Sequence, residues 1–181
     1  MMRLFVALPL PAPLRARLNV VQFLLPMPRR VEPEAMHLTL AFLGDVPGDL
    51  AEDVHYALSA IDHPPLALRL DGLGLFGGDA PRSAHALVAP DPALARLQRK
   101  VETAARRAGA PPEARRFVPH ITLGRFPPLA GDAAFRLERA VAEGAGLGPE
   151  DFAVDRFCLY RSTLGRYGAH YDALADYLLR G

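Results

Sequence analysis

The chain of 181 residues carries 21 Lys and Arg against 20 Asp and Glu, so its formal net charge is +1. This balance excludes a strongly basic nucleic-acid coat protein and an acidic tail protein. Half of the residues are hydrophobic, which excludes a disordered chain. The single cysteine, Cys158, excludes an internal disulfide and a cysteine-based zinc site. No apolar run approaches the roughly 20 residues of a membrane span, and no export signal is evident, so we expect a cytoplasmic protein without membrane attachment.

Apolar periodicity and turn residues predict alternating strands and helices in the first half of the chain. In chain order they are a strand over 3–8, a helix over 13–25, a strand over 37–43, a helix from Asp49 to about residue 61, and a strand that starts at residue 66. Pro13 suits a first helical turn, and Asp49 is a residue type that caps helix N-termini.

The second half repeats this alternation. The predicted elements are a strand over 84–89, a helix over 92–108, a strand over 120–125, a helix over 132–143, and late strands over 152–160 and 170–179. Residues 173–179 are also compatible with a helix. Residues 72–77 match the dinucleotide fingerprint G-x-G-x-x-G, but Gly78, Pro81 and a short strand follow where that fingerprint requires a helix. We therefore interpret residues 72–77 as a strand end and turn.

Two short strings carry the clearest functional signal: H-L-T-L at residues 37–40 and H-I-T-L at residues 120–123. The chain has six histidines and four threonines, so two such matches by chance are improbable. Residues i and i+2 of a strand point to the same face. Each string therefore predicts a strand that buries its aliphatic residues and directs an imidazole and a hydroxyl to one surface.

Two histidines that face one cleft can act as general acid and general base, because an unperturbed imidazole has a pKa of roughly 6.5. Threonine hydroxyls can donate to anionic oxygens. His37, Thr39, His120 and Thr122 together suit phosphoryl transfer at a strained cyclic phosphodiester, which requires no metal ion. Either motif alone would be better explained as a half-buried strand histidine, but the matched pair favours catalysis.

The two strings resemble the paired H-x-T-x signatures of the two-histidine phosphoesterase superfamily. Stretches along nearly the whole chain are similar to the bacterial and archaeal RNA 2′,3′-cyclic phosphodiesterases, also called 2′-5′ RNA ligases: residues 3–8 (RLFVAL), 37–44 (HLTLAFLG), 72–77, 117–125 (FVPHITLGR) and 159–162 (LYRS). The resemblance implies an α+β fold with two pseudo-symmetric lobes, each an antiparallel sheet flanked by helices, and an active-site cleft between them. We expect residues 1–181 to form this single two-lobed domain.

The resemblance also implies a reaction. The family opens a 2′,3′-cyclic phosphate at an RNA end to a 2′-phosphate, without a metal or other cofactor. His37 would be the proton donor to the departing 3′ oxygen, and His120 the proton acceptor that activates water. Thr39, Thr122 and Arg125 would bind the phosphate. The residues alone leave open which histidine is the acid and which the base.

Three further positions follow from this assignment. Strict alternation places Arg125 on the face of Ile121, so a kink or bulge at Gly124, or the end of the strand, is required to turn it toward the phosphate. Phe42 takes the equivalent position in the first motif, where it is a candidate for stacking on a base or, alternatively, a core residue. Phe76 is a second candidate for contact with ribose or base.

Of the remaining histidines, His55 and His63 lie in or just after a predicted helix, and His85 and His170 are isolated. None of them has a partner at zinc-ligand spacing. We expect a monomer whose partner is RNA with a 2′,3′-cyclic phosphate end, such as a tRNA fragment or an oligonucleotide. The alternatives are the reverse reaction, which would join tRNA halves through a 2′-5′ bond, a non-catalytic module that binds RNA ends, and the same chemistry on a small cyclic nucleotide or ADP-ribose cyclic phosphate.

Overall fold

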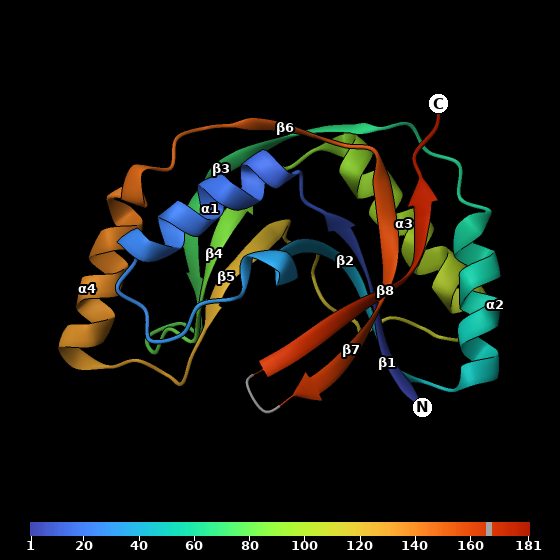
Figure 1. Cartoon of the computed structure of the whole chain (residues 1–181), viewed down its shortest axis with the longest axis horizontal. Helices are drawn as coiled ribbons and strands as arrows, with labels where there is room; N and C mark the ends of the chain where they lie inside the picture. The colour runs from blue at the N-terminus through green and yellow to red at the C-terminus, as the bar shows by residue number, and fades with distance from the viewer. Residues whose placement is uncertain (166–167) are drawn as a thin grey trace.

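The computed structural model describes residues 1–165 and 168–181, and Figure 1 shows its arrangement. The strands are β1 (Met2–Pro9), β2 (His37–Val46), β3 (Leu66–Phe76), β4 (Ser83–Val88), β5 (His120–Arg125), β6 (Asp151–Val154), β7 (Arg156–Gly165) and β8 (Gly168–Leu178). The helices are α1 (Ala12–Leu24), α2 (Gly48–Ser59), α3 (Pro92–Arg107) and α4 (Gly131–Ala142), with short 3₁₀ turns η1 (Pro33–Ala35) and η2 (Gly144–Gly146).

The strands form one antiparallel sheet in the order β6-β3-β4-β5-β2-β1-β7-β8. Its two middle strands, β2 and β5, carry the two histidine motifs, and they are joined through the pair Leu38 and Ile121. The predicted fold class, α+β with antiparallel sheets flanked by helices, is confirmed. The two four-stranded halves are continuous across this central pair rather than separate.

The lobes do not correspond to the two halves of the sequence. Helix α1 follows β1 in the chain but packs near β5, and α4 contacts β3. Helix α3 follows β4 but packs on β2, beside α2. Figure 1 shows α1 and α4 with β3, β4 and β5, and α2 and α3 on the side of β1, β7 and β8. Each lobe is therefore assembled from segments of both halves.

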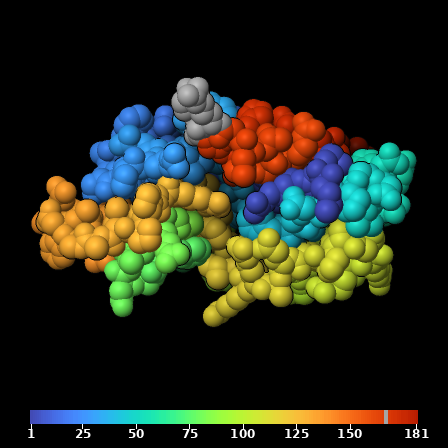
Figure 2. All heavy atoms as spheres, turned by 90° about the horizontal axis from the view of Figure 1, so that it is seen from below, coloured from blue at the N-terminus to red at the C-terminus, as the bar shows by residue number. Residues whose placement is uncertain are grey.

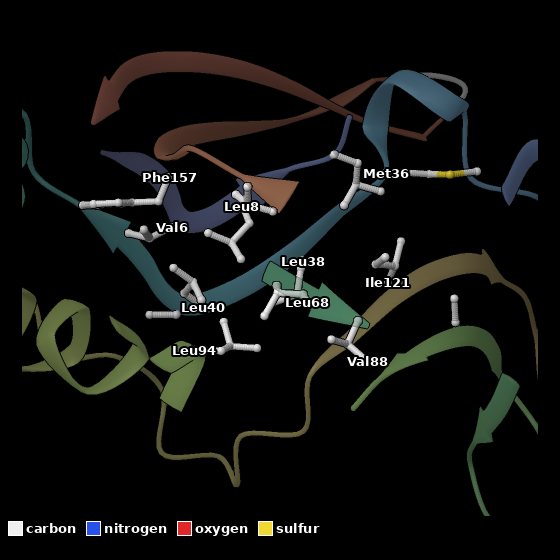
Figure 3. Packing of buried hydrophobic residues seen from close by; sticks show 14 of the residues in the cluster. Val6, Leu8, Met36, Leu38, Leu40, Leu68, Val88, Leu94, Ile121 and Phe157 are labelled. Atoms are coloured by element: carbon white, nitrogen blue, oxygen red, sulfur yellow. The ribbon is translucent and has the colours of Figure 1, made fainter. Parts of the chain in front are cut away.

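The buried face of the sheet holds the two motifs in place. Leu38, Leu40 and Ile121 are at most 3% exposed, and Figure 3 shows them among the aliphatic side chains of Val88 and Leu94. Helix α3 contributes Leu94, Leu97, Val101 and Ala105, which recur at helical spacing and are fully buried. Asp91 caps this helix by accepting a hydrogen bond from the Leu94 amide at 2.8 Å. The core is continuous between the lobes.

Two sequence-based boundaries were wrong. The expected strand over 152–160 is interrupted at Asp155, so that β6 pairs with β3 and β7 pairs with β1, in different lobes. The buried positions change phase there, because Val154 and Phe157 are both buried although three residues apart. Asp49 is not a cap: α2 begins at Gly48, and Asp49 lies in its first turn. A negative charge at that place interacts favourably with the helix dipole.

The end of the chain is extended. Residues 173–179, which were also compatible with a helix, lie mostly in β8 and pair with β7. Within the described ranges, no helix is both long and apolar enough to cross a membrane.

Candidate active site

The register between the two central strands brings the histidine motifs together. Leu38 pairs with Ile121 in antiparallel orientation. One residue further in each direction, the histidine of each motif lies opposite the threonine of the other. The opposed residues are His37 with Thr122, and Thr39 with His120. We call the surface of the sheet that carries these four side chains the motif face.

A bulge then turns a third residue of each strand onto the motif face. In β5, His85 pairs with Thr122 but Ala84 pairs with Gly124, so Leu123 is an extra residue. In β2 the pairing with β1 shifts at the equivalent position, Leu40. Both strands are consequently buried at two successive positions after the threonine, and the following residue is exposed or half-buried. These following residues are Phe42 and Arg125.

Gly124 is required at the bulge in β5. A Cβ atom at this position would lie 2.5 Å from the carbonyl oxygen of Arg29 and would also collide with the sulfur of Met27. Val31 of the same segment donates a hydrogen bond to the Leu123 carbonyl oxygen at 2.9 Å. The segment before β2 is therefore packed directly on the bulge, and only glycine permits this approach.

The two imidazoles are held in the same way. Nδ1 of His37 lies 2.7 Å from the carbonyl oxygen of Ala35, and Nδ1 of His120 lies 2.6 Å from that of Val118. A carbonyl oxygen can only accept, so Nδ1 carries a proton in both rings. Nε2 of each ring has no hydrogen-bond partner among the described residues. Both Nε2 atoms are thus available to a substrate.

The surroundings of the two rings differ. The ring of His37 packs on Phe5 at 4.9 Å and meets the edge of Tyr171 at 5.2 Å between centroids. The ring of His120 instead meets Phe76 at 5.0 Å and His85 at 4.6 Å, both nearly perpendicular to it. The expectation that His85 is isolated was wrong, because β4 pairs with β5 and places it beside the second motif.

Two of the hollows on the motif face contain a threonine of the motifs, and Arg125 lines both. Each combines the histidine of one motif with the threonine of the other, as the strand register requires. The smaller, about 200 Å³, is lined by His37, Thr122, Arg29, Arg30 and Tyr171. The larger, about 410 Å³, is lined by Thr39, His120, Phe42, Phe76, Arg115 and Arg116. Figure 2 shows the molecule hollowed between the green β3–β4 turn and the yellow segment that precedes β5.

Burial controls the charge of both histidines. It lowers the pKa of His37 to about 4; the charges of Arg125 and His120 act in the same direction, and the hydrogen bond to Ala35 opposes them. Burial likewise lowers the pKa of His120, opposed by the hydrogen bond to Val118. Both rings are neutral at pH 7 without substrate, and each presents an Nε2 lone pair.

The structure brings all seven candidate residues together. His37, Thr39, His120 and Thr122 share the motif face, and Arg125, Phe42 and Phe76 line the hollows beside them. Phe42 is half-buried, and the guanidinium of Arg115 lies 5.4 Å from the centre of its ring. Sequence reasoning missed Tyr171 and the Ser83–His85 pair; the i, i+2 spacing of Ser83 and His85 was the available signal. The described residues contain no cluster of His, Cys, Asp and Glu suited to a metal ion.

Comparison with known protein families identifies the family of this chain. Residues 10–166 match the profile of the 2'-5' RNA ligase superfamily, so the chain belongs to this superfamily.

Its relatives extend the likeness to nearly the whole chain. An RNA 2',3'-cyclic phosphodiesterase of Geobacillus stearothermophilus is 35% identical over 87% of this chain, although the match spans only 49% of that protein. The RNA 2',3'-cyclic phosphodiesterase of Escherichia coli is 30% identical over 98% of this chain and 96% of its own. The crystal structure of E. coli LigT complexed with 3'-AMP superposes with a TM-score of 0.73 at 26% identity, covering 99% of this chain and 98% of LigT.

Proposed function

We propose that this protein is an RNA 2′,3′-cyclic phosphodiesterase that hydrolyses the cyclic phosphate at an RNA end to a 2′-phosphate. The observation that carries the proposal is the register of β2 and β5, which sets the histidine of each motif opposite the threonine of the other on one face of the sheet. In such a pair, diagonal residues are about 7–8 Å apart at the backbone. His37 and His120 stand on this diagonal, so their side chains can reach opposite sides of one phosphate group.

The geometry supports in-line displacement at phosphorus. Nε2 of neutral His120 takes a proton from water as the water oxygen attacks phosphorus. The bond from phosphorus to the 3′ oxygen breaks, and protonated His37 gives its Nε2 proton to that oxygen. The products are a 2′-phosphate and a 3′-hydroxyl. His120 is then protonated and His37 neutral, and the return of the enzyme to its starting state requires His120 to lose a proton and His37 to gain one by exchange with solvent.

Binding of the substrate favours the protonated form of His37. In the free protein burial lowers the pKa of His37 to about 4, which disfavours the proton that the acid must carry. A phosphate anion beside the ring favours the imidazolium and raises this pKa. Thr39, Thr122 and Arg125 are placed to hold the phosphate oxygens, where hydrogen bonds strengthen as negative charge develops.

The test uses an oligonucleotide with a 2′,3′-cyclic phosphate end and identifies the product isomer. We expect a 2′-phosphate, with His37→Ala and His120→Ala each slowing turnover by at least about 100-fold, the usual contribution of acid or base catalysis. Prolonged treatment with EDTA should leave the rate unchanged. A 3′-phosphate product, or near wild-type turnover by both variants, would contradict the proposal. Incubation of cleaved tRNA halves in the same experiment measures ligation relative to hydrolysis.

A further inference from the structure

Strand β4 extends the motif face by one strand. It pairs with β5 so that His85 lies opposite Thr122 and Ser83 lies opposite Arg125. Directly opposed residues in an antiparallel pair point to the same face. Ser83 and His85 therefore stand beside two residues that are proposed to bind phosphate, and both line the 410 Å³ hollow.

Ser83 and His85 form a hydrogen-bonded pair. The Ser83 hydroxyl oxygen lies 2.8 Å from Nε2 of His85. His85 is only 3% exposed. Its ring is enclosed by the rings of Phe76 and His120, at 4.1 Å and 4.6 Å between centroids. Its Nδ1 atom is buried and has no partner among the described residues.

Burial makes His85 a neutral ring. It lowers the pKa of His85 to about 3, and the charges of His120 and Arg125 act in the same direction. A neutral imidazole carries one proton, on Nδ1 or on Nε2. A proton on Nδ1 would leave a buried N–H without an acceptor, which is rare and costly in proteins.

The Nε2–H form avoids this cost, since it leaves only a lone pair at Nδ1. In that form His85 donates to the Ser83 oxygen. The hydroxyl proton of Ser83 is then not used within the pair. It remains available to an acceptor in the hollow, on the strand position opposite Arg125.

We propose that Ser83 is a further phosphate-binding residue, which donates its hydroxyl proton to an anionic oxygen held by Arg125, and that His85 is the positioning residue that keeps this hydroxyl a donor. The chemical class of the ligand is a phosphate anion. The inference deepens the proposed function, because in the enzyme this anion is the phosphate of the substrate or product.

The experiment measures inorganic phosphate binding by calorimetry at pH 7, in the full-length protein. Ser83→Ala removes the donor, and Ser83→Thr restores it. His85→Phe retains an aromatic ring against His120 but cannot donate, whereas His85→Gln keeps an N–H donor. Ser59→Ala is the control, because Ser59 is exposed on α2 and donates a hydrogen bond to the Tyr56 carbonyl oxygen.

Loss of a hydrogen bond to a charged acceptor weakens binding by about tenfold or more. We expect Ser83→Ala and His85→Phe to raise the phosphate dissociation constant by about tenfold, with Ser83→Thr, His85→Gln and Ser59→Ala near wild type. In hydrolysis, Ser83→Ala should raise KM with little change in kcat, because this contact exists before and during reaction.

Unchanged phosphate affinity in Ser83→Ala would overturn the inference. So would a loss confined to His85→Phe, which would mean that His85 acts only through His120. Failure of the proposed function gives a different result: the wild type would not hydrolyse the cyclic phosphate, yet Ser83→Ala would still weaken binding of inorganic phosphate.

Discussion

The substitution Gly124→Ala tests whether the bulge in β5 aims Arg125 at the substrate. The added Cβ would lie 2.5 Å from the Arg29 carbonyl oxygen and collide with Met27. The backbone of both segments must therefore shift. Overpacking of this kind costs about 1–3 kcal/mol of unfolding free energy, which is less than the typical 5–15 kcal/mol of a folded domain. The variant should remain folded at 25 °C, so its activity can be measured.

The expected effect on catalysis is measured separately from the effect on folding. A contact between a guanidinium and phosphate is worth about 1.5–3 kcal/mol, so a misdirected Arg125 should lower kcat/KM by roughly 10- to 100-fold. The assay is steady-state hydrolysis of the cyclic-phosphate oligonucleotide, together with a urea melt. Gly148→Ala is the matched control, because a Cβ there meets nothing within 4 Å.

A double variant distinguishes misdirection of the Arg125 side chain from a non-specific disruption of the protein. If Gly124→Ala acts through Arg125, the change should cost little further activity in an Arg125→Ala background. Wild-type kcat/KM in Gly124→Ala would refute the reasoning, and so would fully additive losses in the double variant.

The remaining predictions concern pH. Because the pKa values of His37 and His120 are lowered, the form of the free enzyme with one of the two rings protonated is most populated below pH 6.5. The pH profile of kcat/KM should therefore be bell-shaped, with its maximum on the acid side of pH 6.5. A maximum above pH 7 would contradict this prediction. The kcat profile should lie at higher pH, because bound phosphate raises the same pKa values. For stability, His85 has a pKa of about 3 when folded and roughly 6.5 when unfolded. The unfolded chain therefore binds the extra proton between these values, and stability that is complete above pH 6.5 is lost as pH falls. Denaturant melts should show a slope of about 1.4 kcal/mol per pH unit from this ring, and His85→Phe should remove it.

The motif strands were predictable because their signals are local. Alternation in residues 120–123 assigns each side chain to a face, and Pro119 and Pro127 bracket the strand observed at His120–Arg125. The need to re-aim Arg125 by a kink, a bulge or the strand end followed from alternation together with the phosphate role that the family resemblance implies. These features depend on neighbours within a few residues.

Features that depend on strand pairing were not predictable in this way. Alternation does not specify which strand lies alongside, so neither the crossing of the two motifs nor the place of His85 beside His120 followed from the sequence. The packing around His37 combines Phe5 of β1 and Tyr171 of β8, which are separated by nearly the whole chain. The interruption at Asp155 was missed for the same reason, since β6 and β7 are strands of different lobes.

The central claim is that both imidazoles contact one phosphate, and nuclear magnetic resonance of the ring nitrogens tests it most directly. Protein labelled with ¹⁵N at histidine is titrated with a nucleoside 2′-monophosphate. The spectra of His37→Ala and His120→Ala assign the signals. We predict that the Nε2 signals of both His37 and His120 shift with one shared dissociation constant. A ligand that moves only one of the two signals, or moves them with different constants, would contradict it.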